Sequence, residues 1–191
     1  MTENAVLKKT RLNQQKIDSN IIEGCRKGER KFQEKLYKYF YSYAFNISRL
    51  YTYSVEDAEE VMNESFLKLF NSFNKFDETR SLKTWIRTII INTAIDNYRK
   101  NSRHFGLFNI IETKAQVDEN DIISKLNFQE IIEALNTLPE VYRLTFNLYE
   151  IQGYSHKEIA KKLNISINSS RAYLMRAKNK LKIELTKNNS I

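Results

Sequence analysis

The sequence of 191 residues contains only one cysteine, one proline, four glycines and two histidines. A single cysteine, Cys25, excludes an intramolecular disulfide, fits a reducing compartment and is expected to be a small buried hydrophobic residue. The histidines, His104 and His156, lie far apart, and no cluster of cysteine and histidine has the spacing of metal ligands. No nucleophile is paired with a base. We therefore expect no metal, no cofactor and no catalytic site.

Long apolar runs are also missing from the sequence. No segment approaches the roughly eighteen consecutive apolar residues of a membrane-spanning helix, and no N-terminal signal peptide is visible. We therefore expect a cytoplasmic protein without membrane insertion. The net charge of +8 predicts an acidic partner, and with membranes disfavoured that partner is expected to be DNA.

The scarcity of glycine and proline, together with apolar residues that recur at three and four positions, predicts an all-α fold. The length suits one or two small domains. Residues 1–14 are polar and predicted to form a disordered tail. Between residues 105 and 127 helical periodicity fades, and four acids face two lysines. We interpret 105–127 as a flexible linker that joins two small helical domains, 15–104 and 128–186.

The C-terminal domain contains a helix-turn-helix pattern. Ser155 and Glu158 form a capping box, Asn164 suits the left-handed turn, and Ser166 caps the second helix. Between residues 157 and 182 eight Lys or Arg residues face one acid, which is typical of a surface that meets phosphate. The inward faces are expected to consist of Ile159, Ala160 and Leu163 in the first helix and Ser170, Leu174, Ala177 and Leu181 in the second. The outward face of the second helix is expected to carry Asn168, Ser169, Arg171, Ala172 and Arg176.

The N-terminal domain begins with one or two helices over residues 20–52. Their apolar stripe is predicted to contain Phe32, Leu36, Tyr39, Phe40, Tyr43, Ile47 and Leu50. Ser54 caps a further helix whose inward face is Ala58, Val61, Met62, Ser65, Phe66 and Leu69. Its other side carries Asp57, Glu59, Glu60 and Glu64. Because this acidic side repels DNA, it either faces water, which is the commoner case, or meets a basic protein partner.

A helix over residues 81–101 follows. Its core side is predicted to be Leu82, Trp85, Ile86, Ile89 and Thr93, with Trp85 in the core rather than on a stacking surface. Its exposed side and end carry Arg87, Asn92, Asp96, Arg99, Lys100 and Arg103. This basic and polar mixture suits single-stranded DNA. The preceding loop is expected to contact an extruded base through Phe76, Asp77, Thr79 and Arg80.

Three motifs, in this order, resemble the sigma factors of bacterial RNA polymerase, in particular the small two-domain extracytoplasmic-function group. Residues 57–66 are similar to the polymerase-binding helix of that group. Residues 76–87 and 92–100 resemble its region 2, which melts and reads the −10 promoter element. Residues 138–143, followed by Gly-Tyr-Ser at 153–155, resemble the entry to region 4, whose helix-turn-helix reads the −35 element.

The resemblance implies a transcription initiation factor that binds core RNA polymerase, recognises the −35 and −10 elements of promoter DNA and promotes DNA melting. It also implies an anti-sigma factor as a partner. The residues implied to bind core polymerase are Asp57, Glu60, Asn63 and Glu64. Those implied to bind −10 DNA are Phe76, Asp77, Thr79, Arg80, Arg87, Asn92, Asp96, Arg99, Lys100 and Arg103. Those implied to bind −35 DNA are Asn168, Ser169, Arg171, Ala172, Arg176 and Lys178.

Two other functions fit the sequence less well. A stand-alone helix-turn-helix regulator that forms no holoenzyme would share the C-terminal motif, but it has no use for the 57–64 helix or the 76–103 segment, and a sensing domain is missing. An enzyme that acts on nucleic acid would need a metal site or an activated nucleophile. We therefore expect no enzymatic activity from this chain, with the polymerase performing the chemistry.

Overall fold

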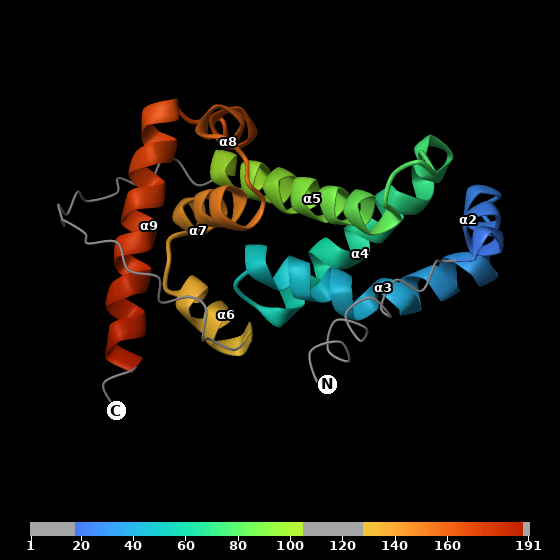
Figure 1. Cartoon of the computed structure of the whole chain (residues 1–191), viewed down its shortest axis with the longest axis horizontal. Helices are drawn as coiled ribbons and strands as arrows, with labels where there is room; N and C mark the ends of the chain where they lie inside the picture. Colours follow the sequence, from blue (N-terminus) through green and yellow to red (C-terminus); the bar gives the residue numbers. More distant parts are fainter. Residues whose placement is uncertain (1–17, 105–127, 189–191) are drawn as a thin grey trace, which may run out of the picture.

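The computed structural model describes residues 18–104 and 128–188, and every regular element in these two ranges is helical (Figure 1). This confirms the predicted all-α fold. The first range contains α2 (Ser19–Arg26), α3 (Arg30–Tyr51), α4 (Val55–Asn71), the 3-10 turn η1 (Phe73–Lys75) and α5 (Leu82–His104). The second contains α6 (Phe128–Asn136), α7 (Glu140–Phe146), the π-helical turn η3 (Asn147–Ile151), α8 (His156–Leu163) and α9 (Ile167–Asn188). The predicted tail and linker lie outside the described residues.

Helices α2 and α3 account for the segment in which one or two helices were expected. Leu36, Phe40 and Ile47 are buried as predicted, but Tyr39 is 49% exposed, so its place in the stripe was wrong. Consecutive residues of a helix point about 100° apart, which moves Tyr39 away from the face that holds Phe40. Cys25 is buried, and burial raises the pKa of its thiol to about 11. Its expected role as a small hydrophobic residue is confirmed.

Helix α4 has the predicted start and the predicted buried face. The hydroxyl of Ser54 accepts a hydrogen bond from the backbone N–H of Asp57 at 3.0 Å, which satisfies one of the unpaired donors of the first turn. All six residues of the predicted inward face are buried: Ala58, Val61, Met62, Ser65, Phe66 and Leu69.

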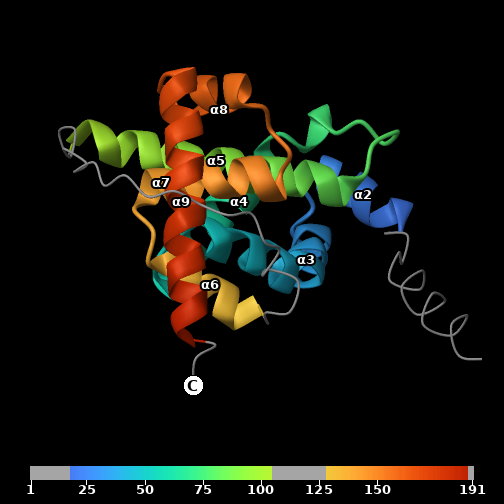
Figure 2. The ribbon, with the colours of Figure 1, turned by 60° about the vertical axis from the view of Figure 1, so that its left-hand side comes forward.

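Helix α5 is buried on more of its circumference than the sequence predicted. Leu82, Ile86 and Thr93 are buried as expected, and Trp85 and Ile89 are partly buried against the same core. Four further residues are buried as well: Ile90, Ile91, Ala94 and Ile95. The reason is that α5 lies between α4 and the C-terminal helices (Figures 1 and 2), so two layers of the protein cover it.

The helix-turn-helix of α8 and α9 follows the sequence closely. The capping box of Ser155 and Glu158 is formed, and Asn164 adopts the left-handed conformation with φ 56° and ψ 49°. The N–H of Ser169 donates to the Ser166 hydroxyl at 2.9 Å, as a helix cap requires. Both predicted inward faces are buried. Helices α6, α7 and α9 share a second core made by Ala134, Leu135, Leu138, Tyr142, Phe146, Leu174, Ala177, Leu181 and Leu185.

The two domains pack against each other. Leu144, Leu148, Ile159 and Leu163 of the C-terminal domain belong to the same buried cluster as the core residues of α3, α4 and α5. The sequence predicted two separate helical units but not this contact.

Candidate functional site

The side of α4 that faces away from the core presents Asp57, Glu60, Asn63 and Glu64, here called the acidic face. Asp57 and Glu60 are exposed. Asn63 is exposed too, and its side-chain oxygen accepts a hydrogen bond from the Tyr37 hydroxyl at 2.9 Å. The sequence therefore predicted correctly that this side of α4 lies outside the core.

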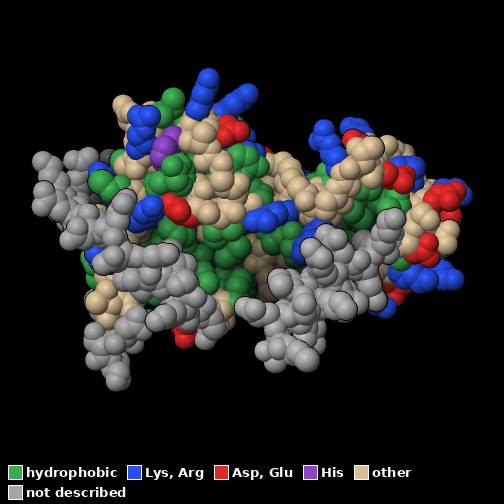
Figure 3. Space-filling model, in the orientation of Figure 1, with side chains coloured by type: hydrophobic (Ala, Val, Ile, Leu, Met, Phe, Trp, Pro, Cys, Tyr) green, Lys and Arg blue, Asp and Glu red, His purple; other side chains and the backbone are tan. Residues whose placement is uncertain are grey.

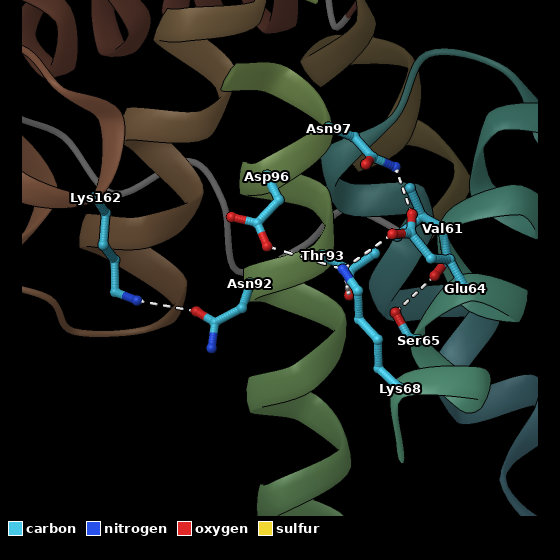
Figure 4. A network of polar contacts seen from close by, with 9 residues as sticks. All are labelled: Val61, Glu64, Ser65, Lys68, Asn92, Thr93, Asp96, Asn97 and Lys162. Atoms are coloured by element: carbon cyan, nitrogen blue, oxygen red, sulfur yellow. Dashed lines mark hydrogen bonds and ion pairs between the residues drawn. The ribbon is translucent and has the colours of Figure 1, made fainter. Parts of the chain in front are cut away.

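Glu64 differs from the other acids of this face because it is held by neighbouring side chains (Figure 4). Asn97 of α5 donates to one carboxylate oxygen at 3.1 Å, and the Lys68 ammonium lies 3.0 Å from the other. Burial alone would raise the pKa of Glu64, but the contacts with Lys68 and Asn97 outweigh it and lower the pKa. Glu64 thus ties α4 to α5, and Asp57 and Glu60 are the acids of this face best placed to meet a partner.

An open cavity of about 580 Å³ adjoins the acidic face. It is lined by Asp57, Glu60 and Glu64 of α4, by Asn97, Tyr98 and Lys100 of α5, and by Glu140 at the start of α7. Burial raises the pKa of Glu140, the nearby Asp57 raises it further, and Arg143 opposes the shift. Sequence reasoning missed Glu140 because its closeness to α4 depends on how the two domains pack.

The loop before α5 does not present Phe76 to solvent. Phe76 is buried, its ring stacks on Trp85 at 5.0 Å with an interplanar angle of 26°, and Phe73 completes the cluster. Our expectation that Phe76 touches an extruded base is therefore contradicted in this conformation, because three rings bury one another. Trp85 lies at this core, as expected.

Asp77, Thr79 and Arg80 are exposed in the same loop. One Asp77 carboxylate oxygen accepts hydrogen bonds from the Thr79 hydroxyl at 2.7 Å and from the Thr79 N–H at 3.0 Å, and these bonds lower the pKa of Asp77. Arg80 lies 3.4 Å from the other carboxylate oxygen. The loop is therefore a preformed turn with an exposed cation.

The outward side of α5 carries Arg87, Asn92, Asp96, Arg99 and Lys100, here called the α5 polar surface. Three of these residues contact the C-terminal domain. Arg87 donates to the Ile151 carbonyl at 3.4 Å, Arg99 donates to the Lys161 carbonyl at 2.9 Å, and Asn92 accepts from the Lys162 ammonium at 3.0 Å (Figure 4). Asp96 lies 3.8 Å from Lys68, and Lys100 is exposed. The side chain of Arg103 lies outside the described part.

Helix α9 presents Asn168 and Arg171 at its exposed start, with the Arg171 guanidinium 3.4 Å from the Asn168 side-chain oxygen. Ser169 shares a 2.8 Å hydrogen bond with Ser166 and so belongs to the helix cap. Ala172 is half-buried. Arg176 donates to the Tyr142 hydroxyl at 3.3 Å, and Lys178 pairs with Glu150 at 2.8 Å. Arg171 is thus the cation of this set best placed for an external ligand.

His156 packs against the start of α9. Its Nδ1 atom lies 3.0 Å from the buried Ser170 hydroxyl, and its ring stacks on Tyr149 at 4.6 Å. Burial lowers the pKa of His156, and Arg171 lowers it further. These two contacts could not be predicted from the sequence, because Tyr149, His156 and Ser170 belong to three different elements. Lys and Arg side chains project from the molecule where α8 and the start of α9 lie (Figure 3).

Two kinds of feature are not found within residues 18–104 and 128–188. No helix there is long and apolar enough to cross a membrane. No group of three or more His, Cys, Asp and Glu side chains in that part of the chain is arranged to hold a metal ion.

Comparisons with known families match both domains. The model of sigma-70 region 2 matches residues 33–104, and the model of sigma-70 region 4 matches residues 128–181. The chain belongs to the sigma-70 family. The first match contains α4 and α5 with the acidic face and the α5 polar surface, and the second contains the helix-turn-helix.

Curated relatives place this sigma factor in the extracytoplasmic-function group. It is 24% identical over 180 residues to the ECF RNA polymerase sigma-E factor of Salmonella typhimurium LT2, covering 87% of this chain and 93% of the relative. It is 27% identical over 162 residues to the RNA polymerase sigma factor YlaC of Bacillus subtilis 168, covering 81% and 92%. A solved structure of the sigma factor RpoE with the anti-sigma factor NepR from Bartonella quintana matches at 22% identity and a TM-score of 0.49, covering 80% and 96%. The two family matches and the sigma-factor relatives show that the protein is a transcription initiation factor.

Proposed function

We propose that this sigma factor binds its partners through three separate surfaces. The acidic face binds core RNA polymerase. The α5 polar surface, with the exposed loop residues Asp77, Thr79 and Arg80, binds the −10 element and promotes melting. The start of α9 reads the −35 element. The observation that carries the proposal is the separation of charge. Exposed acids gather on α4, whereas exposed cations gather on α8 and α9 (Figure 3).

The acidic face suits a protein rather than DNA. Exposed carboxylates repel the phosphate backbone, so Asp57 and Glu60 favour a partner with basic side chains. Glu140 adds a further carboxylate across the adjoining cavity. Asn63 extends this contact, and Glu64 acts mainly by keeping α4 in register with α5.

The α5 polar surface and the loop before it suit unpaired DNA. A preformed turn at Asp77 and Thr79 stands beside Arg80, and a basic track of Arg87, Arg99 and Lys100 follows along the helix. Single strands are bound by cations along the backbone together with sites for individual bases. Phe76 and Trp85 contribute by fixing the loop on α5, since their stacked rings join the two.

The −35 contact depends on the start of α9. Arg171 and Asn168 are exposed there and carry the donors and acceptors that read base edges in the major groove. Ser169, Ala172, Arg176 and Lys178 lie on the same helix, and their intramolecular contacts suit positioning and phosphate binding. We further propose that the chain acts in the cytoplasm, has no catalytic role, and is inhibited by an anti-sigma factor.

Promoter opening tests the proposal. With purified core polymerase and a promoter selected from a library by run-off transcription, permanganate should detect reactive thymines just upstream of the start site. The double substitution Arg80→Ala and Lys100→Ala should reduce that reactivity while the footprint at −35 survives. Arg171→Ala should instead weaken the −35 footprint while permanganate reactivity survives. Unreactive thymines with the unmutated protein, or a −35 footprint that forms equally well without polymerase, would instead support the stand-alone regulator.

A further inference from the structure

One residue on the inward face of α9 is polar. The inward face of a helix is ordinarily apolar, and Leu174 and Ala177 follow this rule, but Ser170 is fully buried in the first turn. A buried hydroxyl needs a hydrogen-bond partner, because an unpaired one destabilises the fold. Ser170 has its partner in α8, since its Oγ atom lies 3.0 Å from Nδ1 of His156.

The imidazole of His156 is held on a second side as well. His156 is the first residue of α8, and its ring stacks on the Tyr149 ring with centroids 4.6 Å apart and an interplanar angle of 24°. Because Tyr149 belongs to η3, this one side chain joins three elements, η3, α8 and α9. The first turns of α8 and α9 are therefore fixed relative to each other by a hydrogen bond and a stacked ring.

The turn of α9 that His156 holds is the one that carries the exposed Arg171. Arg171 follows Ser170 directly in the chain, and its charge adds to the effect of burial in lowering the pKa of His156, so the two side chains lie near each other. Hydrogen bonds to base edges weaken steeply with distance and angle. The direction in which the guanidinium points therefore depends on where the His156–Ser170 pair holds the helix.

We propose that His156 is a positioning residue for −35 recognition, and that it acts by holding the Ser170 hydroxyl so that Arg171 points at its base. The inference rests on the proposed −35 role of α9. A neutral imidazole with its proton on Nε2 accepts a hydrogen bond from the hydroxyl at Nδ1. Loss of this bond should reduce the discrimination between base pairs, whereas the contacts of the protein with phosphates should continue.

Three variants separate the hydrogen bond from the stacked ring. His156→Phe keeps a ring on Tyr149 but has no polar atom for Ser170. His156→Asn is the matched conservative variant, because its side-chain amide, like Nδ1, is bonded to Cγ and can pair with the hydroxyl. The double variant His156→Phe with Ser170→Ala removes both polar groups, so no buried hydroxyl is left unpaired.

Discrimination at −35 is measured by the binding of holoenzyme to rhodamine-labelled promoters that differ at single base pairs. Arg171→Ala first identifies the position at which discrimination is lost. At that position we expect His156→Phe to reduce discrimination about fivefold, the factor that corresponds to one net hydrogen bond. Its affinity for a promoter without a −35 element should stay unchanged. His156→Asn and the double variant should recover most of the discrimination.

A pH series gives a readout that a purely structural role would not change. The charged groups on the elements around His156 are Arg171 of α9, Glu150 of η3, which pairs with Lys178 at 2.8 Å, Glu158 of α8, which accepts from Ser155, and Lys161 and Lys162 at the other end of α8, where α5 approaches. A protonated imidazole would repel Arg171. Discrimination by the unmutated protein should therefore fall as the pH drops below 6.5, the ordinary pKa of histidine, and discrimination by His156→Asn should not.

The outcomes separate this inference from the proposed function. If Arg171→Ala weakens binding to all promoters equally, the −35 readout assigned to Arg171 is wrong. If Arg171→Ala acts at one position but His156→Phe discriminates there as well as the unmutated protein, the positioning role is overturned. The same pH dependence in His156→Asn as in the unmutated protein would also overturn it. Should His156→Phe fail to fold, as judged by circular dichroism, the pH series still decides.

Discussion

Replacing Arg143 with methionine should uncouple the two domains. The guanidinium donates to three acceptors, the carbonyls of Arg49 and Leu50 and the side-chain oxygen of Asn136 at 2.7 Å, and it stacks on the Tyr53 ring at 5.0 Å. Methionine keeps much of the volume and apolar surface of the side chain but supplies no donor. Arg143→Met therefore removes the polar link to α3 with little change in packing.

The size of the effect follows from two opposing contributions. Hydrogen bonds from a charged donor stabilise by ~1.5–3 kcal/mol each, so three of them amount to roughly 5–9 kcal/mol. Burying the guanidinium costs several kcal/mol, and burial lowers its pKa to about 10, which reflects that cost. The net loss should be about 2–4 kcal/mol in the free energy of unfolding, because the Arg49 carbonyl and Asn136 lose their charged donor.

Two probes of urea unfolding measure the coupling. Trp85 is the only tryptophan and reports on the N-terminal domain, whereas far-UV circular dichroism reports on all helices. The unmutated protein should give coincident transitions because one core joins both domains. Arg143→Met should separate them and lower the midpoint, while Arg171→Met, an exposed change, should do neither. Coincident curves and an unchanged midpoint for Arg143→Met would refute the reasoning.

Three further predictions concern single residues. Arg171→Ala should lose ~1–3 kcal/mol of discrimination at particular −35 bases, whereas Lys100→Ala should weaken binding evenly across promoter sequences and reduce its salt dependence, as titrations of promoter variants would show. The fold lowers the pKa of Glu64, so the stabilising effect of its carboxylate is present above about pH 4.5 and is lost as the pH falls through the folded pKa. The stability difference between the unmutated protein and Glu64→Gln should therefore shrink in acid. Phe76→Ala should cost ~3–5 kcal/mol of unfolding free energy as a buried aromatic ring does, and a urea midpoint unchanged by this substitution would place Phe76 outside the core.

Local features of the chain could be predicted from the sequence. Helix caps and turns depend on residues within one turn of each other, so a short stretch of sequence contains both partners of each interaction. This applies to the caps at Ser54, Ser155 and Ser166 and to the left-handed Asn164. The buried faces of α4, α8 and α9 follow from helical periodicity for the same reason. The residue pattern also placed the acidic face and the exposed Arg171 on the outside.

Features that depend on distant segments could not be predicted. Ile90 and Ile91 are buried because a second layer of the protein covers α5. The residue pattern within α5 does not predict that α8 packs on it. Phe76 was expected to contact an extruded base from the loop before α5, but Trp85, nine positions later, supplies the ring on which it stacks. Glu140 joins the cavity beside α4 only through the packing of the two domains.

The two layers of the domain interface, one around Arg143 and one over α5, differ in how their polar groups are paired. Around Arg143 each guanidinium nitrogen has an acceptor, so this layer loses stability if it separates alone. Over α5, cations of the two domains face one another with only single hydrogen bonds between them. A polyanion relieves the repulsion in the second layer and offers nothing to the buried first layer. The contacts around Arg143 should therefore contribute more to the stability of the domain interface than the contacts over α5.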